Sequence, residues 1–354
     1  MKDKYRYGII GTGIPWKEDN ATGFGMANPH CTGYKKTGRT NLVSIADVRA
    51  DHAELFLKRH DEAAVVYSDY QEMLATENLD IVSICTWPHL HAEMAIAACE
   101  AGVPAIHCEK PMGITWGECK RIKAAADASG STLIFNHQRR YLEPFQTAKR
   151  LLEEGAIGTL ERMEAHCGDM SDWGTHWLDM MFFFNNENPA TWVIGQLDSR
   201  EELRTFGVWT EGQAVCHFRF NNGVRAMLVT GFEASIGAAI RLTGSEGVME
   251  ILWDSPWLRL RNGHQAGWQE FPSEEGIHSF VGIDRACADL IRALDEPGYR
   301  PLLTVDHAIQ HTEVIFSLFE SSRRRGRVDL PLNTEDSALK AMVDAGDIGP
   351  GHHA

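Results

Sequence analysis

The sequence predicts an α/β protein: an N-terminal Rossmann domain, with a doubly wound parallel sheet, followed by an α+β domain with a large, open, mostly antiparallel sheet. The 354 residues, 44% of them hydrophobic, suit two domains with sizeable cores. In the first part of the chain, runs that are apolar throughout alternate with amphipathic stretches, as expected for parallel strands covered on both faces. From Leu160 the pattern changes to alternating runs separated by turn pairs, which indicates antiparallel hairpins.

The first domain is expected over residues 1–140. Strand–helix–strand repetition implies right-handed crossovers and therefore a Rossmann topology. The expected strands are Tyr5–Ile10, Leu42–Ala46, Val65–Tyr67, Ile81–Thr86, Pro104–Cys108 and Thr132–Phe135. The expected helices between them include Ala50–Arg59, Leu90–Ala101 and Thr115–Ala128.

The second domain is expected over residues 141–332, with a Gly- and Pro-punctuated tail at 333–354. Alternating runs extend from Leu160 to about Trp268, with turn residues such as Asn221-Asn222-Gly223 between them. The expected helices are Glu143–Glu154, Thr175–Asn185, Ser279–Asp295 and Val305–Arg324.

Composition excludes several classes of protein. The formal net charge is −15, from 49 acidic and 34 basic residues, which disfavours nucleic acid and anionic membranes as partners. We expect no secretory signal at MKDKYRYGII and no membrane span, because no apolar stretch is long enough. The eight cysteines form no C-x-x-C pair, so a zinc ribbon or a disulfide framework is not expected and a reducing cytoplasm is.

A glycine turn follows the first strand. Gly11-Thr12-Gly13 and Ile14 match the first half of a dinucleotide fingerprint, but an insertion, Pro15–Thr22, displaces the third glycine. We predict that these four residues contact the cofactor. The insertion, with Trp16, is expected to form part of a lid over the site.

Asp47 and Val48 follow the second strand, where a carboxylate accepts hydrogen bonds from both ribose hydroxyls of the adenosine. This favours NAD over NADP as the cofactor. Two alternatives stay open. Arg49 would pair with the 2′-phosphate of NADP, and Asp47 would only cap the next helix.

Further candidates follow the fourth, fifth and sixth strands, at the sheet edge where doubly wound folds bind ligands. Proline biases Lys110 towards extended backbone, and a lysine beside a nicotinamide ring would hydrogen-bond the reacting hydroxyl. The alternative is that Glu109 and Lys110 form a surface salt bridge. Arg140 is expected to pair with acidic residues. The candidates for cofactor or substrate contact are Thr86, Trp87, Pro88, His91, Glu109, Lys110, Gln138 and Arg139.

In the second domain, the stretch SDWGTHWLDMM carries Asp172, His176 and Asp179. If a helix begins near Asp172, this spacing places Asp172 and His176 on one face. A carboxylate beside an imidazole orients the ring and raises its basicity, as a general base requires. Alternatively, Asp172 only caps the helix, His176 is a core histidine, or a metal binds. We predict no metal site, because no third ligand lies at a sensible spacing.

His166 and Trp173 are additional candidate substrate contacts. His166 lies on the first strand of the second domain, where half of the residues face solvent, and tryptophans are more often core residues than sugar platforms. Trp173 is singled out because it adjoins Asp172.

Taken together, four motifs resemble those of the Gfo/Idh/MocA oxidoreductases, which include glucose-fructose oxidoreductase and inositol dehydrogenases. The motifs are Gly11-x-Gly13, Thr86-x-Pro88-x-x-His91, Glu109-Lys110-Pro111 and Asp172-x-x-x-His176-x-x-Asp179. The resemblance extends from Tyr5 to about Leu332, in motif order and in domain order.

The resemblance implies NAD or NADP as cofactor and a sugar, anhydrosugar or cyclitol as substrate. It implies that Lys110 contacts the reacting hydroxyl, that His176 is the general base and that Asp172 holds neighbouring hydroxyls, so these three residues are the expected catalytic groups. Arg139 stands where some members contact substrate. The open sheet is expected to mediate a homo-dimer or tetramer.

Three functions follow as hypotheses. The first is an NAD(P)-dependent dehydrogenase acting on a carbohydrate hydroxyl. The second keeps the cofactor tightly bound, so that transient oxidation drives elimination without net redox change. The third is a cofactor-dependent sensor without turnover, which need not keep Lys110, Asp172 and His176.

Overall fold

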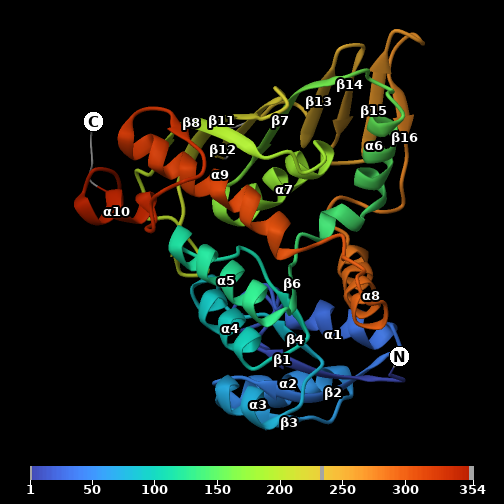
Figure 1. The fold of residues 1–354 in the computed structure, drawn as a ribbon, viewed down its shortest axis with the longest axis vertical. Coiled ribbons are helices and arrows are strands. Elements are labelled where there is room, and N and C mark those ends of the chain that lie inside the picture. The colour runs from blue at the N-terminus through green and yellow to red at the C-terminus, as the bar shows by residue number, and fades with distance from the viewer. Residues whose placement is uncertain (1, 232–234, 351–354) are drawn as a thin grey trace. The chain divides into compact units, whose positions relative to one another are not determined.

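The computed structural model describes residues 2–231 and 235–350. The N-terminal part of the chain forms a six-stranded sheet and the part that follows forms a nine-stranded sheet. Figure 1 shows the two sheets with the helices that accompany them. The predicted fold class is therefore confirmed.

The six-stranded sheet has the strand order β3-β2-β1-β4-β5-β6, and its strands are all parallel. This is the order of a dinucleotide-binding doubly wound sheet, whose switch point lies between β1 and β4. All side chains of β4 and β5 are buried, as expected for strands covered by helices on both faces. The strands are β1 (Tyr5–Ile10), β2 (Thr40–Ala46), β3 (Val65–Tyr67), β4 (Ile81–Ile84), β5 (Ala105–Cys108) and β6 (Thr132–Phe135).

Helices connect these strands at the expected places, except that the seven-residue helix α3 was not predicted. The first helix begins at Ala27, after the insertion. The helices are α1 (Ala27–Lys36), α2 (Ala50–His60), α3 (Tyr70–Thr76), α4 (Pro88–Glu100) and α5 (Trp116–Ser129), and a 3-10 turn follows at Gln138–Tyr141.

The nine-stranded sheet has the order β16-β15-β14-β13-β7-β12-β11-β8-β17. Among its described strands, the pairing of β7 with β12 is parallel and the other pairings are antiparallel. Its strands are β7 (Leu160–Cys167), β8 (Ala190–Asp198), β11 (Gln213–Phe220), β12 (Arg225–Thr230), β13 (Ile240–Gly244), β14 (Gly247–Ile251), β15 (Leu258–Asn262), β16 (Gln269–Phe271) and β17 (Val328–Asp329), and a separate hairpin pairs β9 (Arg204–Thr205) with β10 (Val208–Trp209).

Helices cover one face of this large sheet (Figure 1). Every residue of α7 is buried, which explains its uniformly apolar MMFFF stretch. The predicted tail contains a short helix. The elements are α6 (Glu143–Glu153), the π-helical turn Met170–Gly174, α7 (Thr175–Phe184), α9 (Val305–Arg324) and α10 (Ala338–Ala345).

The chain forms two compact units, and their bounds differ from the predicted 1–140 and 141–332. Residues Phe280–Ala308, which contain α8 (Val281–Asp295), cluster with the first unit. The reason is a tertiary contact: α8 packs against α1, where a Cβ on Gly33 would lie 2.9 Å from Cys287 Sγ. The first unit is Met1–Ile114, Glu118–Gln138 and Phe280–Ala308, and the second is Thr115–Gly117, Arg139–Ser279 and Ile309–Ala354.

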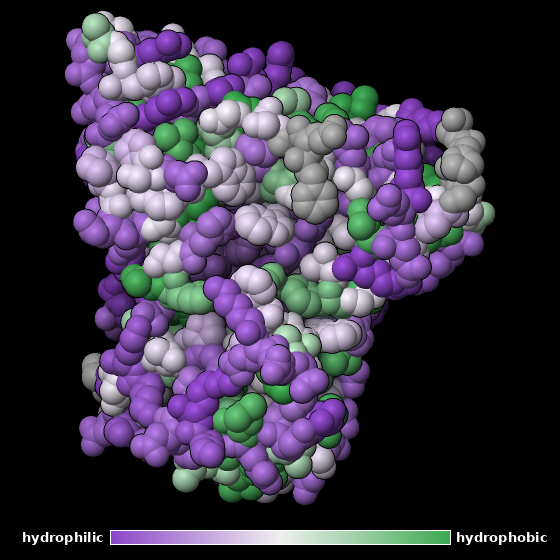
Figure 2. Space-filling model, turned by 180° about the vertical axis from the view of Figure 1, so that it is seen from behind, coloured by the Kyte–Doolittle hydropathy of each residue, from purple (hydrophilic) through white to green (hydrophobic). Residues whose placement is uncertain are grey.

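The surface seen in Figure 2 is mainly hydrophilic, with scattered small apolar areas. Among residues 2–231 and 235–350, no helix combines the length and apolar character needed to cross a bilayer.

Candidate active site

The glycine turn lies at the carboxyl end of β1, between β2 and β4. Gly11 has a φ of +83°, and a Cβ there would lie 2.6 Å from the Thr86 side chain and 3.1 Å from its backbone nitrogen. Glycine is therefore required by both the backbone conformation and the close approach of the strand end. This tight turn at the switch point has the form that a dinucleotide site needs.

Asp47 is tied to the same turn. Its Oδ2 accepts hydrogen bonds from Thr12 N (2.8 Å) and Thr12 Oγ1 (2.6 Å), and Gly13 N lies at 3.3 Å. Its Oδ1 accepts one from Arg49 N (2.9 Å). Asp47 is not the N-cap of α2, which is Arg49, so the interpretation as a simple helix cap is wrong. The carboxylate holds the turn and the start of the next loop together.

Two neighbours of Asp47 bear on cofactor choice. The Arg49 guanidinium forms a bidentate pair with Asp51, at 2.9 and 2.6 Å. This hydrogen bond and charge pair lower the pKa of the Asp51 carboxyl. Arg49 is therefore already neutralised, which favours NAD over a 2′-phosphorylated cofactor. Val48 is 87% exposed and accessible to a ligand.

The insertion folds back against the turn. Thr22 Oγ1 accepts a hydrogen bond from Ile14 N at 2.7 Å, and Thr22 O accepts one from Trp87 Nε1 at 2.7 Å. Trp16 is 60% exposed, and its ring meets Phe24 edge-on at 6.4 Å. The turn amides of Thr12, Gly13 and Ile14 thus all have partners within the first unit, so a bound pyrophosphate would have to compete with Asp47 and Thr22 for them.

His91 supports the loops around this site. Its ring is fully buried, with Nδ1 2.7 Å from Pro111 O and Nε2 3.0 Å from Thr86 O. It joins the end of β4 to the loop after β5, and Thr86, Trp87 and Pro88 lead into α4. Burial lowers the pKa of the His91 imidazole.

Glu109 and Lys110 follow β5, as predicted, but they are not a surface salt bridge. Glu109 is 4% exposed, and its Oε1 lies 2.9 Å from His30 Nε2 and accepts a hydrogen bond from Asn136 Nδ2 at 2.7 Å. Burial alone would raise the pKa of the Glu109 carboxyl, but His30, Lys110 and Asn136 hold it below its ordinary value. Lys110 Nζ lies 6.0 Å from the centre of the Phe24 ring.

The His30 contact was missed from the sequence. His30 is fully buried in α1, its Nδ1 lies 3.0 Å from Ser83 Oγ, and its ring lies 4.0 Å from the ring of His107. The one signal in the sequence that could have revealed this contact is a histidine on the buried face of the first helix. This network fixes the carboxyl end of β5, which carries Lys110.

Gln138 lies in the 3-10 turn after β6. Its side chain packs against α8, because a Cβ on Gly282 would lie 3.1 Å from it. Among the described residues, Gln138 Oε1 is buried without a hydrogen-bond partner.

In the second unit, Asp172 and His176 lie on consecutive helical segments. Asp172 is in the π-helical turn and His176 is in the first turn of α7, and the two residues are 7% and 6% exposed. The cap is Asp169, whose Oδ1 accepts a hydrogen bond from Asp172 N at 2.6 Å, so the interpretation of Asp172 as the cap is wrong. π-helical turns are frequent at functional sites.

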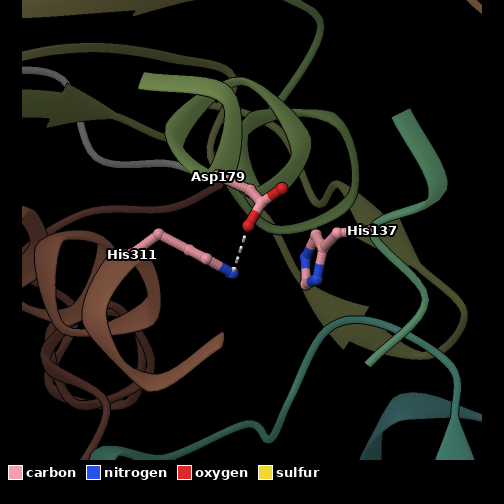
Figure 3. A group of neighbouring side chains, drawn as sticks. All are labelled: His137, Asp179 and His311. Atoms are coloured by element: carbon pink, nitrogen blue, oxygen red, sulfur yellow. Dashed lines mark ion pairs between the residues drawn. The ribbon is translucent and has the colours of Figure 1, made fainter. Parts of the chain in front are cut away.

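Asp179 has a structural role. Arg140 Nη2 and Nε donate to its two carboxylate oxygens at 2.7 and 2.9 Å, and Arg140 also pairs with Glu187 at 2.6 Å. The predicted pairing of Arg140 with acidic residues is confirmed. Figure 3 shows Asp179 with His311 of α9, whose Nε2 lies 3.8 Å from Asp179 Oδ1; His137, also drawn there, belongs to the first unit.

Arg139 lies in a cluster of rings, which we call the aromatic box. The guanidinium carbon stands 4.5 Å from the Trp177 ring centre and 5.9 Å from that of Trp173, and Nε donates to Ile277 O at 3.2 Å. The box consists of Arg139, His166, Trp173, Trp177, Trp253 and His278.

The ring contacts within the box are close. Trp253 meets His166 at 5.2 Å and Trp177 at 5.5 Å, and Trp173 meets His278 at 5.3 Å. The structure therefore brings together three predicted substrate contacts, Arg139, His166 and Trp173. Trp177, Trp253 and His278 were not predicted, because their sequence positions look like ordinary core or loop positions.

A parallel 3-2-1-4-5-6 sheet with a glycine turn at its switch point is the architecture of a dinucleotide-binding domain, and a second unit built on a large open sheet accompanies it. Residues 5–137 match the family model described as "Oxidoreductase family, NAD-binding Rossmann fold", Gfo/Idh/MocA. The N-terminal part of the chain thus matches this family, in agreement with the resemblance inferred from its motifs.

Relatives and solved structures agree with this. An inositol 2-dehydrogenase of Pseudomonas savastanoi pv. phaseolicola is 29% identical over 164 residues, 46% of this chain and 45% of the relative. An inositol 2-dehydrogenase/D-chiro-inositol 3-dehydrogenase of Shouchella clausii is 27% identical over 51% of this chain and 53% of the relative. The chain thus spans about half the length of the curated relatives it matches.

The fold is similar along most of the chain. A levoglucosan dehydrogenase in complex with NADH and L-sorbose superposes with a TM-score of 0.80 at 21% identity, over 94% of this chain and 100% of that one. A myo-inositol 2-dehydrogenase from Lactobacillus plantarum superposes with a TM-score of 0.71 at 20% identity, over 92% and 99%.

Proposed function

We propose that this protein is an NAD-dependent dehydrogenase that oxidises a hydroxyl group of a sugar, anhydrosugar or cyclitol. The observation that carries the proposal is the position of Lys110 directly after β5, at the carboxyl end of an NAD-type parallel sheet. Asp172 and His176, both buried within the second unit, supply the further groups that such chemistry needs. Relatives named as inositol dehydrogenases support the substrate class.

The residues present fit NAD. The turn at Gly11 leaves no room for a side chain, Asp47 offers a carboxylate after β2, and Arg49 is neutralised by Asp51. Gly11, Thr12, Gly13, Ile14, Asp47, Val48, Thr86, Trp87 and Gln138 would hold the cofactor. When bound, NAD supplies the acceptor for the hydride that leaves the substrate carbon.

Side chains of the protein bind and deprotonate the substrate hydroxyl. Lys110 donates a hydrogen bond to the reacting oxygen and stabilises the negative charge that develops on it. His176 accepts the hydroxyl proton as the C–H bond breaks and the carbonyl forms, and Asp172 anchors a neighbouring hydroxyl. Glu109 and His30 act on Lys110 indirectly, since they fix the strand end that carries it.

The test compares Lys110→Ala and His176→Ala with Lys58→Ala and His264→Ala, whose native side chains are exposed. We expect kcat to fall by about 10²- to 10⁴-fold in the first two variants, because general acid–base groups contribute factors of that size. Cofactor affinity, measured by fluorescence titration, should change little. Near-wild-type turnover in either variant would refute the assignment.

A substrate screen separates the alternatives. Monosaccharides, anhydrosugars and inositols are tested with NAD and NADP, with NAD(P)H absorbance as the readout. Purified protein that retains stoichiometric nicotinamide and releases no net NADH would instead support the redox-neutral elimination. Stable partner complexes without turnover would support the sensor.

A further inference from the structure

The aromatic box contains buried donors without acceptors. Within the described part of the chain, Arg139 Nη1, Trp177 Nε1 and Trp253 Nε1 are buried and have no hydrogen-bond partner. Guanidinium and indole N–H groups donate hydrogen bonds and cannot accept them. Since buried donors in folded proteins are nearly always paired, this cluster lacks a group that supplies acceptors.

One contact within the box accounts for part of this. Trp177 and Trp253 meet edge-on, at 5.5 Å and 86°, a geometry that allows at most one indole N–H to point at the face of the other ring. Such a contact satisfies at most one of the two indoles. Arg139 Nη1 and the second indole are still without acceptors in the described residues.

Arg139 carries a positive charge that is not balanced by an ion pair among the described residues, whereas the charge of its neighbour Arg140 is balanced. Arg139 is 4% exposed, and burial lowers its pKa to about 10, so it stays protonated at neutral pH. Asp172 and Asp179 act on it through space, but no ion pair to it occurs among the described residues, whereas Arg140 is bidentate with Asp179.

Of the two histidines in the box, His278 is the one that contacts Arg139, and it is a neutral acceptor. Burial and the charge of Arg139 lower the pKa of His278 to about 4, so its ring is uncharged at pH 7. Its Nδ1 lies 3.4 Å from Arg139 Nη2 and accepts from it. This leaves the second ring nitrogen of His278 as a further N–H donor.

We propose that the aromatic box binds a carboxylate on the substrate, so that the preferred substrate is a sugar acid rather than a neutral sugar. The proposal rests on the proposed function, whose substrate it narrows. A carboxylate offers acceptors and no donors, and the planar guanidinium of Arg139 matches its geometry. The net charge of −15 acts against anions at long range, but salt screens that field beyond roughly 8–10 Å.

The experiment uses matched pairs that differ at one carbon: D-glucuronate and D-glucose, and D-galacturonate and D-galactose. NADH formation gives kcat/KM, and calorimetry on the protein with saturating NAD gives affinity independently of turnover. The variants are Arg139→Gln and Trp253→Phe, which keeps an aromatic ring but removes the N–H. The control is Trp268→Phe, whose ring packs against Arg259 outside the box.

We expect the wild type to prefer an acid by at least tenfold. Arg139→Gln should abolish that preference by weakening acid binding about 10- to 100-fold, and by clearly more than it weakens binding of the neutral sugar. Trp253→Phe should weaken acid binding several-fold, which keeps the test decisive if Arg139→Gln does not fold. Trp268→Phe should behave as wild type.

The two proposals fail differently. Equal kcat/KM for acids and neutral sugars, with normal NADH formation, would overturn the sugar-acid inference and leave the dehydrogenase intact. Absence of NADH formation with every substrate would refute the dehydrogenase. Calorimetry would then decide on the box: tighter binding of the acid that is lost in Arg139→Gln supports it, and no preference overturns it.

Discussion

At position 11, an added Cβ atom would prevent the nucleotide turn from forming. The backbone there is left-handed, and the neighbouring Thr86 fills the space that a side chain would need. Asp47 then accepts three hydrogen bonds from the turn and a fourth from Arg49 N. The sequence identified both residues, but it did not predict the hydrogen bonds between Asp47 and the glycine turn, because hydrogen bonds between distant loops cannot be read from spacing.

The Gly11→Ala variant tests this. We expect NAD affinity to fall more than tenfold and the free energy of unfolding to fall by roughly 1–3 kcal/mol, from backbone strain and the clash with Thr86. The control is Gly38→Ala, which also has positive φ but no described atom within 4 Å of the added Cβ. It should cost roughly 1–2 kcal/mol of stability and leave NAD affinity unchanged. Equal NAD affinity in both variants would contradict the prediction.

Among the elements, the π-helical turn before α7 rests on a buried carboxyl group. Glu211 Oε1 accepts hydrogen bonds from Met170 N at 2.6 Å and from Thr230 Oγ1 at 2.8 Å. Burial and the charge of Asp169 raise the pKa of Glu211 to about 7. This group was not predicted, because an acidic residue that follows an exposed hairpin is usually a surface residue.

Glu211 should therefore make stability depend on pH. Its folded pKa lies above the unfolded value, so its contribution is fully present below about pH 4.5 and is lost as the pH rises through about 7. We expect Glu211→Gln to be more stable than wild type at pH 8, by up to about 3 kcal/mol, and to show no such gain at pH 4.5. Urea unfolding at both pH values measures this.

Glu161→Gln, which changes an exposed carboxylate on β7, serves as the control and should show no such difference. A stability difference between wild type and Glu211→Gln that does not change with pH would contradict the assignment.

The insertion, Pro15–Thr22, lies against the glycine turn. Thr22 and Trp87 tie it to the glycine turn, and Trp16 and Phe24 leave apolar rings exposed beside it. We predict that it forms part of a lid over the nucleotide site.

Deletion of residues 15–22 should weaken NAD binding several-fold, as measured by fluorescence titration, while Trp16→Ala should have a smaller effect. Unchanged NAD and substrate affinities in the deletion variant would show that the insertion has no role in ligand binding.

At the scale of the whole molecule, the large sheet has one face covered by helices and one that carries exposed apolar side chains. Ile194 of β8 is 44% exposed and Val215 of β11 is 41% exposed, and Val229 of β12 pairs with Val215. Exposed apolar residues that lie on neighbouring strands favour association. We expect a homo-dimer or tetramer formed through this face.

The Ile194→Asp/Val215→Asp double variant should lower the mass measured by light scattering to that of the monomer, because burying two carboxylates in an interface is costly. The control is Leu55→Asp, because Leu55 of α2 is as exposed, at 41%, as Val215; this variant should not change the mass. A monomeric wild type, or an unchanged mass in the double variant, would contradict the prediction.

The sequence by itself determined the fold class and the six parallel strands, and it singled out Gly11, Asp47, Lys110, Asp172 and His176 as candidate site residues. These follow from hydrophobic period, turn residues and strand-end positions, all of which are local. Tertiary structure decided what local patterns cannot express. In the folded chain, α8 packs with the first unit, and His30 contacts Glu109. Arg139 lies beside Trp177, Trp253 and His278 in the aromatic box. These partners are distant in sequence, and burial and hydrogen bonding depend on packing that only the folded chain creates.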